Sequence, residues 1–166
     1  MDEITKFEDE ILHGKYTIEN FEAKYLKNIV WQYYKAKITT DRTIGVLDSK
    51  IQKSGFFSLK KSAFVNCKDF LQDLYAQMNN ANVEFNAIEN LIDNSPEKVQ
   101  TLQELLFDDD HKMTMAMHIL SCYCKAKGLG AQELLSVYPI KEYLEEIGDE
   151  DLMQKYGIQE RGVKRW

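Results

Sequence analysis

Residues 108–124, DDDHKMTMAMHILSCYC, decide the fold class of this chain, because their apolar side chains recur at the spacing of an α-helix. When the stretch is wound at about 100° per residue, one face becomes apolar and the opposite face stays polar. The apolar face is formed by Met113, Met117, Leu120 and Cys124. The acidic residues at the start can cap a helix and interact with the positive end of its dipole; they are Asp108, Asp109 and Asp110. The stretch therefore predicts a helix over residues 109–127, which Gly128 ends.

The opposite face of this helix carries the side chains best suited to bind a metal ion, His111, His118 and Cys122. His118 and Cys122 are one helical turn apart, so a single zinc ion can contact both of them. His111 lies about 10.5 Å from His118 along the helix axis, a separation that two imidazoles barely bridge. A structural zinc site needs four ligands, and the chain has no CxxC or HExxH pattern that would supply the rest. We therefore expect no metal site and no cofactor, and His118 and Cys122 stay as weak candidates.

Helical periodicity also dominates the rest of the chain, which has no run of strict alternation and no Asn-Gly or Asp-Gly hairpin signal. The further helices that the pattern predicts cover residues 3–13, 18–38 (capped by Thr17), 39–53 (capped by Thr39 or Thr40), 63–79 (capped by Ser62), 83–93, 96–107, 131–137, 139–147 and 149–156. The expected fold is an all-α bundle of about seven to nine helices. We expect one domain over residues 1–157 and a basic C-terminal tail over residues 158–166.

Size and composition favour a globular protein that folds without a metal ion or disulfide bonds. The chain has 166 residues, of which 44% are hydrophobic and 29% are charged, and a chain of this length buries roughly 70% of its unfolded surface. No apolar run reaches the ~18 residues that span a membrane, and the acidic start MDEITKFEDEILHG does not resemble a signal peptide. We therefore expect a cytoplasmic protein that does not enter membranes, with its three cysteines reduced.

The formal net charge is −6, but the charged residues are grouped into blocks. Residues 39–69 carry six basic and three acidic side chains, whereas residues 70–110 carry one basic and nine acidic side chains. Residues 129–157 carry two basic and seven acidic side chains. One interpretation is that solvated helix faces happen to be charged. The other is a bipolar surface, whose acidic helices over residues 84–110 and 133–151 steer a partner with a basic surface.

Trp31 is the most unusual aromatic residue, because it falls outside the apolar stripe of its predicted helix and is grouped with Lys24, Lys27 and Lys35. In one interpretation another helix covers it. In the other, Trp31 is exposed among lysines and contacts a protein or a nucleic acid through cation–π and stacking interactions. We expect partner contacts at these four residues and at the acidic side chains Asp108, Asp109, Asp110, Glu145, Glu146, Asp149, Glu150 and Asp151.

Motifs for enzymatic function are missing from the sequence: it contains no P-loop, no GxGxxG and no GxSxG pattern. The leading hypothesis is a non-enzymatic acidic helical protein that binds and inhibits or regulates a protein partner, of the immunity-protein or anti-host-factor type. One alternative is a regulator associated with nucleic acid through the basic region 42–68. Another is a metal-binding enzyme or sensor built on the helix over residues 109–127. The identity of the partner and the oligomeric state stay open.

Overall fold

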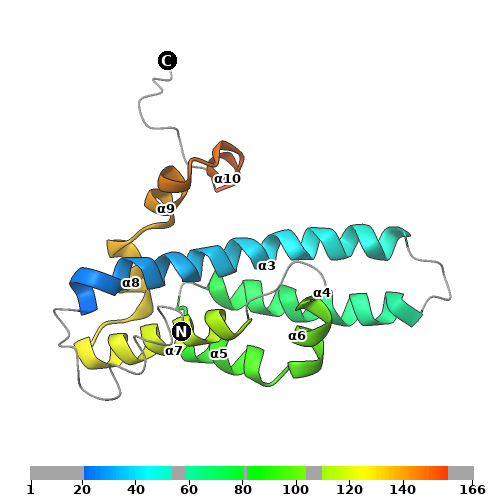
Figure 1. Ribbon diagram of the computed structural model, residues 1–166, viewed down its shortest axis with the longest axis horizontal. Coiled ribbons are helices and arrows are strands. Elements are labelled where there is room, and N and C mark those ends of the chain that lie inside the picture. The colour runs from blue at the N-terminus through cyan, green and yellow to red at the C-terminus, as the bar shows by residue number, and fades with distance from the viewer. Residues whose placement is uncertain (1–20, 54–58, 81, 104–109, 157–166) are drawn as a thin grey trace.

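The protein is described by a computed structural model, in which its regular structure is helical (Figure 1). The described residues are 21–53, 59–80, 82–103 and 110–156. Within them, a π-helical segment is followed by eight α-helices. These elements are η1 (Glu22–Leu26), α3 (Lys27–Lys53), α4 (Leu59–Met78), α5 (Phe85–Asp93), α6 (Pro96–Gln103), α7 (Asp110–Lys127), α8 (Ala131–Val137), α9 (Ile140–Ile147) and α10 (Glu150–Lys155). The expected all-α, multi-helix fold is confirmed. The expected helix over residues 3–13, the cap at Thr17 and the tail 158–166 lie outside the described residues.

The expected helix break at Thr39 or Thr40 is wrong, because α3 runs through both residues without interruption. The Thr40 hydroxyl donates to the Ala36 carbonyl oxygen at 2.7 Å, and the Thr43 hydroxyl donates to the Thr39 carbonyl oxygen at 2.7 Å. These buried hydroxyls therefore form hydrogen bonds within α3. Thr39 and Thr40 lie inside the helix, and neither of them caps a new one. The expected cap at Ser62 is also wrong, since α4 begins before it, at Leu59.

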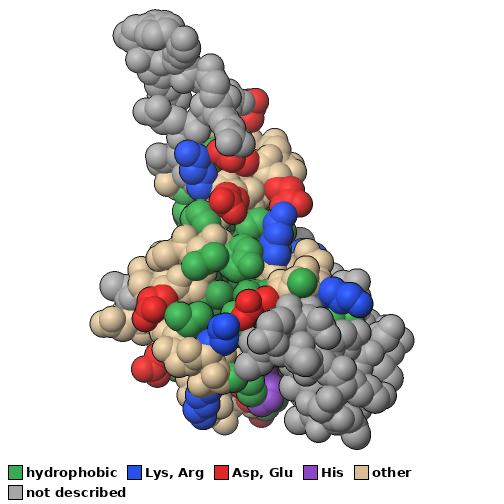
Figure 2. Space-filling view, turned by 90° about the vertical axis from the view of Figure 1, so that its left-hand side faces the viewer, with side chains coloured by type: hydrophobic (Ala, Val, Ile, Leu, Met, Phe, Trp, Pro, Cys, Tyr) green, Lys and Arg blue, Asp and Glu red, His purple; other side chains and the backbone are tan. Residues whose placement is uncertain are grey.

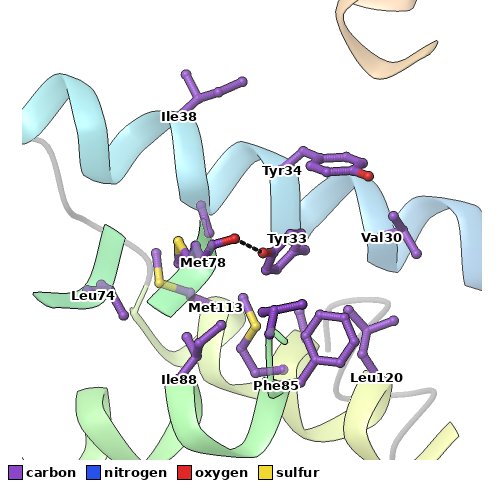
Figure 3. Close-up of a cluster of buried hydrophobic side chains, with 14 of the residues drawn as sticks. Val30, Tyr33, Tyr34, Ile38, Leu74, Met78, Phe85, Ile88, Met113 and Leu120 are labelled. Carbon is purple, nitrogen blue, oxygen red and sulfur yellow. Dashed lines mark hydrogen bonds between the residues drawn. The ribbon is translucent and has the colours of Figure 1, made fainter. Parts of the chain in front are cut away.

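Helix α3 lies between two layers of the molecule. Figure 1 shows helices α4 to α7 on one side of α3 and the short helices α9 and α10 on the other, with α8 connecting the two layers. In Figure 3, Val30 and Tyr33 of α3 point toward Phe85, whereas Tyr34 and Ile38 point away from it. Since all four of these α3 side chains are buried, α3 is covered on two faces, and a single amphipathic stripe does not describe it.

The adjacent residues Tyr33 and Tyr34 each complete the end of another helix. The Tyr33 hydroxyl donates to the carbonyl oxygen of Met78, the last residue of α4, at 2.9 Å. The Tyr34 hydroxyl donates to the carbonyl oxygen of Tyr138, at the end of α8, at 2.6 Å. Carbonyl groups at helix C-termini have no partner within their own helix. Burial raises the pKa of both tyrosines, so the hydroxyls stay protonated as donors.

The helix predicted from residues 109–127 begins at Asp110 and ends at Lys127, so this prediction is confirmed. Its expected apolar face is buried, and the side chains on it are Met113, Met117, Leu120 and Cys124. Figure 3 shows Met113 and Leu120 in the cluster formed with Phe85 and Ile88 of α5. The main core therefore lies between α3, α4, α5 and α7. None of the described helices has the length and apolarity needed to cross a membrane.

Candidate protein-interaction surface

Trp31 is partly buried, because residues from α8 and α9 cover it. Its ring centroid lies 5.5 Å from that of Tyr143 and 6.3 Å from that of Tyr138, and both pairs are edge-to-face. Tyr34 adds a third ring at 6.0 Å. Edge-to-face geometry places the positive edge of one ring against the negative face of the next. Trp31 therefore belongs to an aromatic cluster that joins α3 to the C-terminal helices.

Two sets of expected partner-binding residues contact each other at this cluster. One set is Trp31 with its lysines, and the other is the acidic side chains of the C-terminal helices. The indole nitrogen Nε1 of Trp31 donates to Glu146 Oε2 at 2.5 Å. Lys27 Nζ lies 3.5 Å from the same oxygen and 5.5 Å from the centroid of the Trp31 ring. The hydrogen bond from Trp31, followed by the charge of Lys27, lowers the pKa of Glu146. The other two lysines of the set, Lys24 and Lys35, are exposed.

Some charged side chains of α9 and α10, and of the turn between them, form ion pairs with α3. Asp149 Oδ2 lies 3.2 Å from Arg42 Nη2 of α3, and Lys155 pairs with Asp41 of α3. The Asp149 side chain also accepts the backbone N–H of Leu152, so it caps α10 as well. Glu146 and Asp149 are therefore directed at α3. The remaining acidic candidates of this block are Glu145, which lies 4.0 Å from Lys141 Nζ, and the exposed Glu150 and Asp151.

The face that includes the C-terminal helices is mixed in character. Figure 2 shows acidic and basic side chains interspersed over its upper part, above a group of hydrophobic side chains. Among the described residues, Val137 at the end of α8 and Ile147 at the end of α9 are exposed large hydrophobic residues, with 65% and 47% of their surface accessible. Among the residues that the structure describes, charges of both signs lie close together on this part of the molecule and form no purely acidic patch.

The acidic block 70–110 keeps its charge on the surface where the structure describes it. The exposed acidic residues of this part are Asp73, Glu84, Asp93 and Glu97. Lys98 is the one basic residue of the described part of the block, residues 70–80 and 82–103. Asp108 and Asp109 lie outside the described residues, as does the side chain of Asp110. Residues 70–80 and 82–103 thus carry an excess of acidic side chains, and we call the exposed Asp73, Glu84, Asp93 and Glu97 the α4–α6 acidic surface.

Two basic side chains of the region 42–68 form ion pairs within the chain. Arg42 pairs with Asp149, and Lys68 pairs with Asp48. Lys50 Nζ lies 6.0 Å from the centroid of the Phe64 ring. Engaged cations are less available to phosphate groups. Arg42 and Lys68 are therefore less available to a nucleic acid.

Glu89 of α5 lies beside His118 on the polar face of α7, a contact that the sequence did not predict. Cys122 Sγ lies 3.7 Å from His118 Nε2, and His118 Nδ1 lies 3.5 Å from Glu89 Oε2 of α5. No spacing in the sequence relates Glu89 to His118, because the packing of α5 on α7 brings them together. The side chain of His111 lies outside the described residues. No group of three or more His, Cys, Asp or Glu side chains in the described parts of the chain is arranged to hold a metal ion.

Two open hollows lie beside each other near the start of α8, and both are lined by Val83 and Gln132. The first, of about 410 Å³, lies against Cys124 and Lys125 of α7. The second, of about 350 Å³, lies against Tyr33, Tyr34 and Lys37 of α3. The hydroxyl groups of both tyrosines already donate to backbone carbonyls. The two tyrosine hydroxyls of the second hollow are therefore already engaged within the chain.

Comparison with known proteins gives no guide to function. No family model matches the chain, and no curated protein or solved structure is significantly similar to it.

Proposed function

We propose that this protein is non-enzymatic and that it binds and inhibits or regulates a protein partner with a basic surface. The observation that carries the proposal is the α4–α6 acidic surface, where Asp73, Glu84 and Asp93 are exposed. An excess of negative charge on a surface raises the rate at which a partner of opposite charge is captured and disfavours partners of like charge.

Contacts within the chain favour one of the two predicted acidic surfaces as the binding site. Glu146 and Asp149 contact Lys27, Trp31 and Arg42 of the same chain, so a partner would have to displace these contacts to reach them. The acidic side chains of α4 to α6 require no such displacement of α9 and α10. We therefore place the partner on α4, α5 and α6, and we assign α9 and α10 to the stability of α3.

The charge also indicates the class of the partner. Exposed carboxylates on a folded surface resemble the phosphates of a nucleic acid in charge, although not in shape. An enzyme that acts on nucleic acids has a cleft lined by lysine and arginine, and such a cleft fits an acidic inhibitor. This is the immunity-protein or anti-host-factor type of function.

Affinity capture from native lysate, read by quantitative mass spectrometry at low salt, tests the proposal. The test variant is D73N/E84Q/D93N, and the matched control is E142Q/E150Q/D151N, which makes the same change in net charge on α9 and α10. We expect the test variant to retain about tenfold less partner, equivalent to about 1.4 kcal/mol of binding free energy, and the control to retain nearly as much as the wild type. Equal losses in both variants would show an effect of net charge alone. No loss in the test variant would remove the α4–α6 acidic surface as the binding site.

A further inference from the structure

The edge of α7 brings a thiol, an imidazole and a carboxylate into one chain of contacts. Cys122 is exposed, and His118 precedes it by one helical turn. The Cys122 Sγ to His118 Nε2 distance is 3.7 Å, and the His118 Nδ1 to Glu89 Oε2 distance is 3.5 Å. The side chains of His118 and Glu89 are 43% and 20% exposed, so the carboxylate is the more enclosed end and the thiol is the more accessible end.

This order of groups suits the activation of a nucleophile. A carboxylate next to one ring nitrogen favours the tautomer that carries its proton there, which leaves the other nitrogen free to accept a proton. With Glu89 beside Nδ1, the nitrogen that faces Cys122 is the accepting one. The same carboxylate stabilises the imidazolium that forms when the thiol proton is transferred. Lys125, three residues after Cys122 on α7, is the next charged residue along the helix.

We propose that Cys122 is a nucleophilic thiol, assisted by His118 and Glu89, and that it is a site of mixed-disulfide formation with small disulfides. In this step the thiol proton passes to His118 Nε2 and the sulfur attacks one sulfur of the disulfide. The disulfide bond of the reagent breaks as the new one forms. The departing thiolate then takes the proton from His118, so that one disulfide and one thiol are converted into another disulfide and another thiol.

The other two cysteines of the chain provide an internal comparison. Cys67 and Cys124 are buried, with 2% and 8% of their surface exposed. Burial raises the pKa of both thiols, which disfavours the reactive thiolate. Neither has a histidine among the contacts that the structure gives it. We therefore expect modification at Cys122 and not at Cys67 or Cys124 in the folded protein.

Reaction of the full-length protein with glutathione disulfide, followed by peptide mapping, tests the proposal. The variants are His118→Gln, which removes the base, and Glu89→Gln, which removes only the orienting charge. At pH 7 we expect Cys122 to react about threefold faster in the wild type than in His118→Gln, since a larger thiolate fraction is partly offset by weaker nucleophilicity. Glu89→Gln should lie between them. The three rates should converge at alkaline pH, where the thiol ionises without a base.

Two results would overturn the proposal. The first is an equal rate at Cys122 in the wild type and in His118→Gln throughout the neutral range. The second is modification of Cys67 or Cys124 in the folded protein at the rate of Cys122. Reaction in denaturant, where all three thiols are accessible, provides the reference rate for each variant and separates a loss of activation from a loss of reagent access.

Discussion

Glu146 links the aromatic cluster of α3 to the C-terminal helices. Its carboxylate accepts the hydrogen bond from Trp31 and lies near the ammonium group of Lys27. Because these contacts favour the ionised carboxylate, the pKa of Glu146 lies below its ordinary range. The stabilisation from this contact is therefore present above the pKa that Glu146 has in the unfolded chain, and it is lost as the pH falls through its lower value in the folded protein.

Trp31 fluorescence reports this titration directly. The chain has two tryptophans, so the Trp166→Phe background makes Trp31 the single tryptophan. We expect the Trp31 emission to change in a step at acidic pH, as Glu146 is protonated and the indole loses its charged acceptor. The step should be absent from Glu146→Gln and retained in Glu142→Gln, which removes one charge from the same helix. A step of equal size in Glu146→Gln would assign the titration to another group.

At the scale of the element, the turn between α9 and α10 depends on a residue that tolerates left-handed backbone. Gly148 ends α9 with φ +69°, and Asp149 then caps α10. Gly45 lies in the middle of α3 and has helical backbone, and a Cβ added at either glycine would meet no atom within 4 Å. These two glycines therefore differ in conformation and not in available space.

Alanine substitutions at the two glycines should change stability in opposite directions. Gly148→Ala should lower the free energy of unfolding by about 1–2 kcal/mol, which is the cost of left-handed backbone for an L-residue. Gly45→Ala should raise it by about 0.5–1 kcal/mol, because alanine is a better helix former than glycine. Chemical denaturation of both variants alongside the wild type measures the difference. A destabilising effect of Gly45→Ala would argue that α3 bends or opens at this position.

Local signals in the sequence predicted most elements, and contacts between distant residues explain the failures. Pro96 opens α6 and the apolar stripe of α7 is buried, because both features depend on residues within one helix. The break expected at Thr39 or Thr40 does not occur. Helix α3 is buried on two faces, and the Thr40 hydroxyl donates to the Ala36 carbonyl oxygen within the helix. The contact between Glu89 and His118 needed the packing of α5 on α7. No pattern along the chain contains that information.

At the scale of the whole molecule, the two layers around α3 differ in how much of their packing is apolar. Most of the buried apolar core lies on the α4–α7 side, and Leu144, Leu152 and Met153 extend it to α9 and α10. The α9–α10 side combines aromatic rings with ion pairs such as Lys27–Glu146, whose side chains are both 53% exposed. Exposed ion pairs contribute little to stability and are screened by salt. The α9–α10 layer should therefore open more readily than the core.

Native-state hydrogen exchange tests this difference between the layers. We expect the amides of α9 and α10 to exchange at least about tenfold faster than those of α3 and α7, since local opening does not require the core to open. Added salt should speed exchange in α9 and α10 and leave the core helices almost unchanged. Equal protection in both layers would mean that the molecule opens as one cooperative unit.

The position of α3 between two layers also determines when its surface is completed during synthesis. Trp31 and Glu146 are 115 residues apart, which corresponds to roughly 6–23 s of translation at about 5–20 residues per second. Throughout this interval the nascent chain lacks the helices that cover Trp31 and Tyr34. The earliest described α-helix to leave the ribosome is therefore the one whose surface is completed last.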